Sequence, residues 1–504
     1  MSVENLATSE LIILREKNQA LEVRLAQYEK YIEILESAIK DSRRKLYAPS
    51  SEKIDEQLNL FNEAEKEESD ETPELPIGGL DDDTVIIPEH KRRKRGRKPL
   101  PAELPREEVI IDLKEEEKFC PVHGEPLKEI GRDISEKLEI IPMKIWVKRT
   151  IVIKYADTCC DHSKIKTAPL PNEMIPRSIT TPGLLAHVAT SKFCDGLPFY
   201  RLENIFERSG IDISRGAMAH WMMRVGEKLL PLYMLLELYL LSSKYIQCDE
   251  TTVQVLNEEG KKATSTSYMW VRARPGSQPI VLFKYAPSRS GATAKLILKD
   301  FKGHVQVDGY GGYNCVCDGL EIIRIGCLYH VRRKFFDSLK SSTIGKRIAE
   351  KAIAIIKLIA NEDEKVKKLP LLKRLDAKKE NVRPLFEKLR ALIDDNLRKF
   401  PPKTQIGRAF IYAHNEWINL EKYFDGADFE LSNNFIENAI RPFALGRKNW
   451  LFFSSVEGAQ ASEVIYSLIE TAKANGKEPY QYLKKLFEEL PNTPEEDLHT
   501  LLPF

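Results

Sequence analysis

The strongest constraint on the fold of this chain comes from two strand patterns that each carry an aspartate. Residues 245–255 alternate and are rich in β-branched side chains, and residues 303–308 repeat this pattern before a glycine-rich turn. Between them lie two more strand patterns and one helical pattern, at 268–274, 279–286 and 288–300. A strand that returns to its sheet through a helix makes a right-handed crossover and lies parallel to the earlier strand. The sequence therefore predicts an α/β core in which Asp249 and Asp308 face each other across neighbouring strands.

Two carboxylates on adjacent strands, joined by a third, suit phosphoryl transfer. Oxygen ligands hold Mg²⁺, and two such ions clamp the attacking and leaving oxygens of an in-line displacement. Glu437 is the third candidate, on a helical pattern at 431–442 that we expect to end at Pro442. Simpler explanations exist, because Asp308 also fits an Asp-Gly turn and Glu437 an ion pair with Arg441 one turn later. If Glu437 is not the third acid, the nearest alternatives are Glu421, Asp425, Asp428 and Glu430.

The N-terminal part of the chain carries a heptad pattern in a polar context. Apolar residues recur at alternating spacings of three and four from Leu11 to Ile39. Asn18 falls at an a position, where a polar residue favours a parallel dimer, so we predict a homodimeric coiled coil within residues 1–48. The alternative is one amphipathic helix that lies on its own globule. Residues 49–90 are predicted to be an acidic linker with one short helix.

A basic arm, residues 91–106, follows the acidic linker. Its sequence Arg95-Gly96-Arg97-Lys98-Pro99 resembles the core of an AT-hook, which lies extended in the minor groove of A·T-rich DNA. Such a run is also found as a solvated tail, and the acidic linker could neutralise it within the chain. We predict DNA contacts from Arg95, Arg97 and Lys98.

Residues 107–170 form a predicted β-rich unit with strand patterns at 109–113 and 145–155. The unit holds two Cys–His pairs, each with two intervening residues: Cys120 with His123, and Cys159 with His162. Two such pairs joined by a hairpin suit tetrahedral Zn²⁺. Cys160 is a rival ligand with a poorer spacing to His162, and the alternative without metal is reduced cysteines beside unrelated histidines.

Residues 171–243 are predicted to be helical, with helices at 182–192, 198–208 and 215–230. The turn between the last two contains Gly210 and a capping Ser214, which is the order of a helix-turn-helix DNA reader. Ordinary packing of helices explains the pattern equally well. The apolar run at 229–241 is too short to span a bilayer and contains Pro231, so it predicts a buried helix.

Bulk composition restricts the compartment more than the function. The net charge of +1 does not indicate a nucleic-acid binder, because acidic and basic segments cancel. Eight cysteines in 504 residues do not make a disulfide framework, and the N-terminus lacks the apolar core of a signal peptide. We therefore predict a cytoplasmic protein without membrane contacts.

Several motifs, in this order, resemble the TnpC-type transposases of the insertion-sequence sixty-six family. They are Asp249-Glu250-Thr251, Asp308-Gly309-Tyr310-Gly311-Gly312-Tyr313, Cys327-Leu328-Tyr329-His330 with Val331-Arg332-Arg333-Lys334-Phe335, Ser432-Asn433-Asn434 through Glu437 to Arg441-Pro442, and Gly446-Arg447-Lys448-Asn449-Trp450. The heptads, the Ser50-Ser51-Glu52-Lys53 segment, the basic arm and the two Cys–His pairs extend the resemblance over nearly the whole chain. One departure is Cys120 with His123, where the family often has two cysteines, so the zinc ligand set stays open.

The resemblance implies an RNase H-like core with an Asp-Asp-Glu triad, carried onto Asp249, Asp308 and Glu437, and two Mg²⁺ ions. It implies cleavage and strand transfer at the ends of an insertion sequence, with terminal repeats and target DNA as partners and separate accessory proteins. It also implies a helical insertion that divides the core. The resulting parts, after the basic arm and the zinc-like unit, are helical DNA-binding residues 171–243, core residues 244–340, the insertion 341–428, core residues 429–475 and a helical tail 476–504.

Further cations are candidates for contacts with the DNA backbone. Arg332, Arg333 and Lys334 are predicted on one helix, and Arg447 and Lys448 in a loop before a strand-like segment at 450–454. Arg441 is placed one turn beyond Glu437, and we expect Cys327 to be packed and His330 to be polar or to face a phosphate. Each cation also fits ordinary surface charge. Two other functions remain open: a DNA-binding regulator, and an RNase H-like nuclease or resolvase that cuts without joining.

Overall fold

A computed structural model describes residues 145–156, 165–167, 169–316, 321–340 and 343–504. The heptads, the acidic linker, the basic arm and all four predicted zinc ligands lie outside these residues. Residues 171–504 belong to one compact unit, and the described residues before them belong to a second.

In that second unit, β1 (Lys154–Ala156) pairs antiparallel with β2 (Ile165–Thr167). The strand predicted from 145 is wrong over 145–153, because an alternating pattern needs a partner strand and the ladder joins only the β1 residues to β2.

Three helices open the larger unit. In α3 (Pro182–Phe193), the Thr181 side chain accepts from the backbone N–H of the first turn. The next helix, α4 (Phe199–Arg208), is joined to α5 (Arg215–Leu241) by a turn in which Gly210 has a φ of 75°. The helix predicted to end at residue 230 continues through Pro231, because Leu229, Leu232, Leu236 and Leu240 form one buried face. Among the described residues, no helix is long and apolar enough to cross a membrane.

The sheet confirms the predicted strand order. β3 (Tyr245–Asn257), β4 (Thr266–Arg274) and β5 (Ile280–Ala286) form an antiparallel meander. After α6 (Gly291–Ile297), β6 (Gly303–Gln306) returns parallel to β3, and β7 (Ile322–Ile325) adds parallel to β6. The order is β5-β4-β3-β6-β7, with β8 (Phe453–Ser455) paired to the far end of β3. The core is therefore mixed α/β, as expected for the predicted RNase H-like core.

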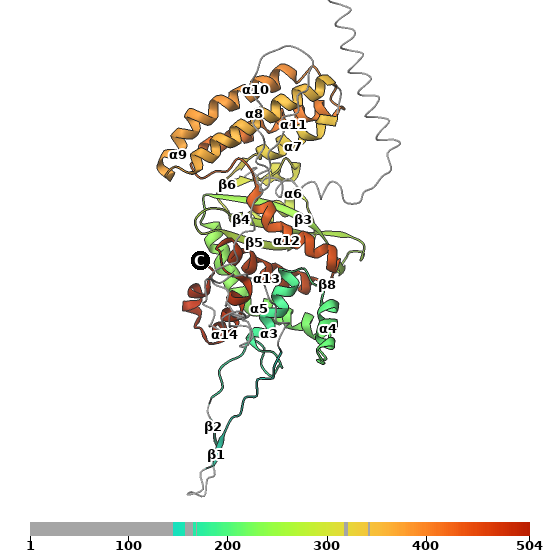
Figure 1. Cartoon of the computed structure of the whole chain (residues 1–504), viewed down its shortest axis with the longest axis vertical. Coiled ribbons are helices and arrows are strands. Elements are labelled where there is room, and N and C mark those ends of the chain that lie inside the picture. The colour runs from blue at the N-terminus through green and yellow to red at the C-terminus, as the bar shows by residue number, and fades with distance from the viewer. Residues whose placement is uncertain (1–144, 157–164, 168, 317–320, 341–342) are drawn as a thin grey trace, which may run out of the picture. The chain divides into compact units, whose positions relative to one another are not determined.

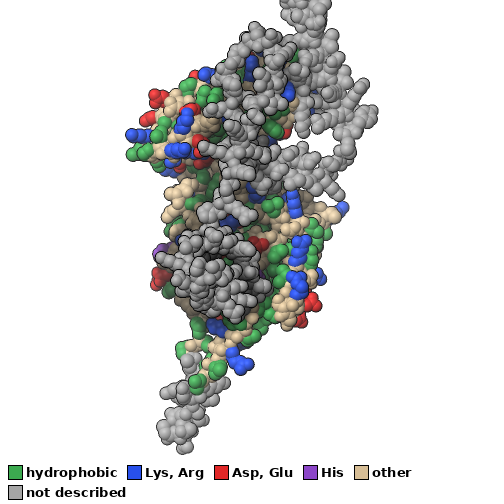
Figure 2. Space-filling view, in the orientation of Figure 1, with side chains coloured by type: hydrophobic (Ala, Val, Ile, Leu, Met, Phe, Trp, Pro, Cys, Tyr) green, Lys and Arg blue, Asp and Glu red, His purple; other side chains and the backbone are tan. Residues whose placement is uncertain are grey.

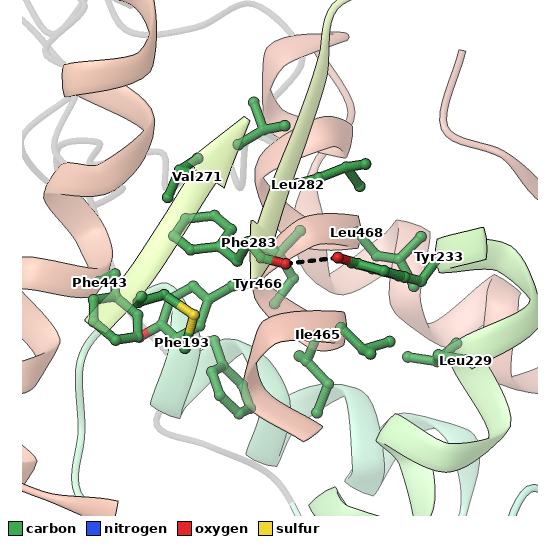
Figure 3. Close-up of a cluster of buried hydrophobic side chains, with 14 of the residues drawn as sticks. Phe193, Leu229, Tyr233, Val271, Leu282, Phe283, Phe443, Ile465, Tyr466 and Leu468 are labelled. Atoms are coloured by element: carbon green, nitrogen blue, oxygen red, sulfur yellow. Dashed lines mark hydrogen bonds between the residues drawn. The ribbon is translucent and has the colours of Figure 1, made fainter. Parts of the chain in front are cut away.

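β5 is an edge strand, and within the part of the chain that the structure describes no further strand pairs with its outer side. Side chains of α13 (Val456–Ala474) bond the backbone N–H groups on that side instead. Ser467 Oγ accepts from Phe283 N at 2.8 Å, Thr471 Oγ1 accepts from Val281 N at 3.1 Å, and a Glu463 carboxylate oxygen accepts from Tyr285 N at 2.7 Å. These three residues recur every four positions and so lie on one helix face. Figure 3 shows the apolar cluster around Phe283 beside them, where Tyr233 donates to the Phe283 carbonyl. An edge strand is thereby protected from pairing with another chain. The chain ends with α14 (Pro479–Glu489) and short 3₁₀ turns.

A layer of helices follows β7 and has its own apolar core. Its elements are α7 (Leu328–Asp337), α8 (Thr343–Lys367), α9 (Leu371–Ala377), α10 (Arg383–Asn396) and α11 (Gln405–Glu421). A π-helical turn, Lys378–Val382, joins α9 to α10. Figure 1 shows these helices together on one side of the sheet, and Figure 2 shows mixed cations and anions over their outer surface. Their core includes Tyr245 of β3 and Ile325 of β7, so the layer packs against the sheet.

The last element of the site, α12 (Asn434–Trp450), is longer than predicted. It passes through Pro442 and ends at Trp450, so the expected end at Pro442 is wrong, and Arg447 and Lys448 lie in the last helical turn rather than in a loop. A proline removes one helical hydrogen bond, but buried side chains on both sides of it, Ile440 and Phe443 among them, hold the helix together. The predicted strand at 450–454 is shortened accordingly to β8.

Candidate active site

The parallel pairing of β3 with β6 brings the two predicted aspartates together. The ladder ends with Gln247 paired to Gln306, and each glutamine is followed two residues later by an aspartate, Asp249 or Asp308. The two aspartates are near enough that the Asp308 charge acts on Asp249. Each carboxylate is fixed by a local backbone bond: Asp249 Oδ1 accepts from Glu250 N at 2.8 Å, and Asp308 Oδ1 accepts from Tyr310 N at 2.9 Å. Because side chains alternate along a strand, Asp249 shares a sheet face with Gln247.

The N-terminus of α12 lies over this same face. Gln247 Oε1 accepts from Ile436 N at 3.1 Å, and Gln247 Nε2 donates to Ser432 O at 3.0 Å. Glu437 follows Ile436 directly, in the first turn of α12, and its side chain is mostly buried. Asp308 and Glu437 are far apart in the sequence, but contacts between β3 and the start of α12 hold Glu437 near the sheet.

Sequence reasoning missed a buried pair of glutamines behind the acids. Gln306 Oε1 accepts from Gln247 Nε2 at 3.0 Å and from the Tyr245 hydroxyl at 2.6 Å, and Gln306 Nε2 donates to Glu430 O at 2.8 Å. Both glutamines are fully buried. Each lies two residues before an aspartate of the site, and that repeated position, a polar amide inside an apolar strand, was the available signal.

The acids repel one another electrostatically. Burial raises the pKa of Asp249 well above its usual range, and the charges of Glu250, Glu437 and Asp308 raise it further. Glu250 lies on the opposite face, where it pairs with Arg289 and accepts from Tyr313, and burial still raises its pKa. A divalent cation stabilises the ionised form of such a cluster, because its positive charge offsets the repulsion among the carboxylates.

The donor set fits Mg²⁺, since it consists of carboxylate oxygens from three separate elements. Within the described ranges, no group of three or more His, Cys, Asp and Glu side chains is arranged to hold a metal ion. Asp249, Asp308 and Glu437 would be the residues that hold it, because the pKa of Asp249 responds to both of the others.

Replacing Asp249 with Asn should stabilise the protein in buffer without Mg²⁺ or Mn²⁺. A carboxyl whose folded pKa is raised contributes stability at low pH and loses it as the pH rises through the folded pKa. The variant should therefore match the parent near pH 4 and melt roughly 2–5 °C higher at pH 8. Scanning calorimetry across this range checks the result, with the exposed Asp300→Asn as control. A gain that is equal at every pH would contradict the assigned cause.

Helix α7 approaches Glu437 from the other side. His330 Nε2 and Arg333 Nη2 each lie 3.8 Å from one of the two Glu437 carboxylate oxygens. Burial, with help from the Arg333 charge, lowers the pKa of His330 to about 4, so its ring is neutral at pH 7. Cys327 is buried as expected, and burial raises the pKa of its thiol to about 12, which makes it an inert packed residue.

The predicted DNA-contact residues divide into two groups. Arg332 and Arg333 are partly exposed on α7, Lys334 is exposed beside them, and Lys448 is exposed at the end of α12. Arg447 instead turns inward: its Nη1 donates to the hydroxyls of Thr251 and Thr252 at 3.0 and 2.9 Å and to the Thr252 carbonyl. Burial lowers its pKa, and its contacts fix α12 to β3. Arg441, half-buried, lies one turn beyond Glu437.

The glycine after Asp308 has a packing role. A Cβ at Gly309 would collide with the ring of Tyr412 from α11, so a larger residue here would have to displace that ring. The helical layer thus touches the residue next to a candidate ligand.

Similarity to known proteins covers most of this chain. A family model described as "Transposase IS66 family" matches residues 177–461, and one described as "IS66 C-terminal element" matches 467–504. Residues 34–109 match a leucine-zipper model described as "Transposase C of IS166 homeodomain". Residues 117–161 match a model described as "zinc-finger binding domain of transposase IS66", which takes in three of the four predicted zinc ligands and stops before His162.

Two proteins of Sinorhizobium fredii (strain NBRC 101917 / NGR234) are similar along most of their length. Uncharacterized protein y4jD is 31% identical over 452 residues, which cover 85% of this chain and 86% of that protein. Uncharacterized protein y4qI is 31% identical over 490 residues, which cover 93% of this chain and 88% of that protein. The shared region therefore includes the sheet, the helical layer and α12.

Proposed function

Because the chain belongs to the IS66 family of DDE transposases, we propose that Asp249, Asp308 and Glu437 form its catalytic triad and that it cuts and joins the ends of its element. One observation carries the assignment: the Gln247 side chain, two residues before Asp249, bonds both Gln306, two residues before Asp308, and the backbone of Ile436, next to Glu437. The pKa of Asp249 agrees with this assignment, because burial, the Glu250 charge, and then the charges of Glu437 and Asp308 raise it.

The reaction consists of two in-line displacements at phosphorus. In the first, a water oxygen bonds to phosphorus at the element end, the bond from phosphorus to the 3′ oxygen breaks, and that oxygen leaves as a 3′-hydroxyl. In the second, this hydroxyl attacks a target phosphodiester and displaces a new 3′ oxygen, which takes up the proton. Bound Mg²⁺ supplies positive charge at the attacking and leaving oxygens.

The protein residues collect and orient the reactants. Asp249, Asp308 and Glu437 supply the negative charge that holds the cations. Arg332, Arg333 and Lys334 on α7, with Arg441 and Lys448 on α12, are proposed to bind the DNA backbone beside them. Arg447, which is predicted from the sequence to contact the DNA backbone, bonds Thr251, and we propose that it also holds α12 on β3.

The N-terminal modules extend the proposal beyond the described residues. The zinc-finger match takes in Cys120, His123 and Cys159, and it supports the proposal that these residues bind Zn²⁺ together with His162, which follows the matched residues. The homodimer through the Leu11–Ile39 heptads is proposed from the heptad pattern, and the leucine-zipper match, residues 34–109, takes in the end of that pattern. Arg95, Arg97 and Lys98 are proposed to enter the minor groove near the terminal repeats. Accessory transposition proteins are proposed as further partners from the family resemblance alone.

A strand-transfer assay tests the proposed function. Full-length protein is mixed with labelled element ends, supercoiled target DNA and Mg²⁺, and the products are separated on denaturing gels. Cleavage at the element end followed by joining to the target is expected. Binding without cleavage would instead indicate a DNA-binding regulator, and cleavage without joining would indicate a nuclease or resolvase.

A further inference from the structure

The segment that leads from the helical layer into α12 is held by a buried lysine. Lys378 Nζ donates to Gly426 O at 2.9 Å and to Phe429 O at 2.7 Å, and it lies 3.9 Å from the centre of the Tyr423 ring. Its side chain is only 2% exposed. The lysine begins the π-helical turn between α9 and α10, a rare distortion that is frequently found at functional sites.

A second lysine holds the next residues of the same segment. Lys367 Nζ lies 2.7 Å from a carboxylate oxygen of Glu430, and it also pairs with Asp363 at 3.3 Å. The Glu430 carbonyl in turn accepts from Gln306 Nε2. Contacts therefore run without a break from the helical layer through Glu430 to the glutamine pair, and from there to Ile436 beside Glu437.

The helical layer also reaches Asp308. Arg324 Nη2 donates to the Asp308 carbonyl at 2.9 Å and to Glu416 of α11 at 2.7 Å, while its Nη1 donates to Asn314 at 2.6 Å. Arg324 and Glu416 are both largely buried. One buried ion pair therefore fixes the backbone of a candidate metal ligand to the layer.

We propose that the helical layer is a positioning element of the active site, in which Lys378 sets the place of Glu437 and Glu416, through Arg324, sets that of Asp308. The proposal rests on the proposed function. Metal affinity depends on how closely the acids are held, and partners behind metal ligands typically change affinity by about 10–100-fold. Loosening either contact should therefore weaken metal binding while the fold persists.

The chemistry of Lys378 favours this role over a purely structural one. Burial lowers the pKa of its ammonium to about 8, against the nearby charges of Asp363, Glu430 and Asp428, with Lys367 adding repulsion. A buried charge is unfavourable compared with an apolar residue of similar size, so stability alone would favour methionine. The lysine offers what methionine lacks: two directed bonds to the segment before α12.

The test uses full-length protein saturated with Zn²⁺, and it measures Mn²⁺ binding by electron paramagnetic resonance without DNA. Lys378→Met and Glu416→Gln should each weaken Mn²⁺ binding about tenfold. The same variants should raise the Mg²⁺ concentration needed for half-maximal cleavage by a similar factor, with the maximal rate largely recovered at high Mg²⁺. A merely structural residue would not produce this split.

Two control variants change the helical layer without touching either positioning contact. Lys365→Met removes an exposed lysine of the same layer, and Ile359→Val disturbs its buried core, so both should bind Mn²⁺ like the parent. Parental Mn²⁺ binding by Lys378→Met and Glu416→Gln would overturn the positioning role. Asp249→Asn should abolish the Mn²⁺ signal; if it does not, the proposed catalytic site fails, whatever the other variants show.

Discussion

Cleavage at the element ends should fall by about 1,000-fold or more in each of Asp249→Asn, Asp308→Asn and Glu437→Gln. Each change replaces one charged oxygen with an amide of nearly the same shape, so the sheet and α12 are retained. What is lost is the negative charge that gathers cations at Asp249, within β3, at Asp308, just after β6, and at Glu437 in the first turn of α12. Binding to the element ends should persist, because the proposed DNA contacts lie on other residues.

Nicking of labelled ends in Mg²⁺ and a mobility-shift assay, run on the same preparations, separate the two activities. Asp300→Asn is the matched control, since this aspartate is exposed and lies just before β6. Retained cleavage in Glu437→Gln would move the third acid elsewhere, and Glu430, whose carbonyl lies beside the glutamine pair, would be the first to examine.

The sheet could be predicted because its rules are local. Alternating apolar residues marked β3 to β6, and the handedness of a crossover connection then fixed β6 beside β3 without any knowledge of the rest of the chain. Asp249 and Asp308 followed from that step alone. The helical layer was expected from spacing together with the family resemblance.

The errors arise where distant packing overrides a local signal. Pro442 normally ends a helix, but α12 continues because its apolar side chains are buried on both sides of the proline. The sequence places Arg447 in a loop, whereas it lies in α12, and only the position of β3 shows that its guanidinium bonds Thr251 and Thr252. The sequence near Gln247 does not predict which residue it bonds, because its partner Ile436 lies far along the chain.

Gln247→Leu is the second change from which we expect a large effect. The leucine fits an apolar strand, yet it leaves Ile436 N, Ser432 O and Gln306 Oε1 without this partner. Each buried polar group left unpaired costs about 1–3 kcal/mol, so the melting temperature should fall. Cleavage should fall about 100-fold, because the start of α12, and with it Glu437, is no longer fixed to β3. Gln254→Leu on the same strand, where the amide is partly exposed and bonds only a loop carbonyl, should have little effect on either.

A double variant decides whether Gln247 acts through Glu437. If the glutamine serves to hold that acid in place, then combining Gln247→Leu with Glu437→Gln should reduce cleavage no further than Glu437→Gln alone, since the second change has already removed what the first displaces. Single-turnover cleavage rates of the parent, both single variants and the double variant complete the cycle. Independent, multiplying losses would mean that the amide affects catalysis by another route, such as the register of β3 with β6, and that the contact to Ile436 is only structural.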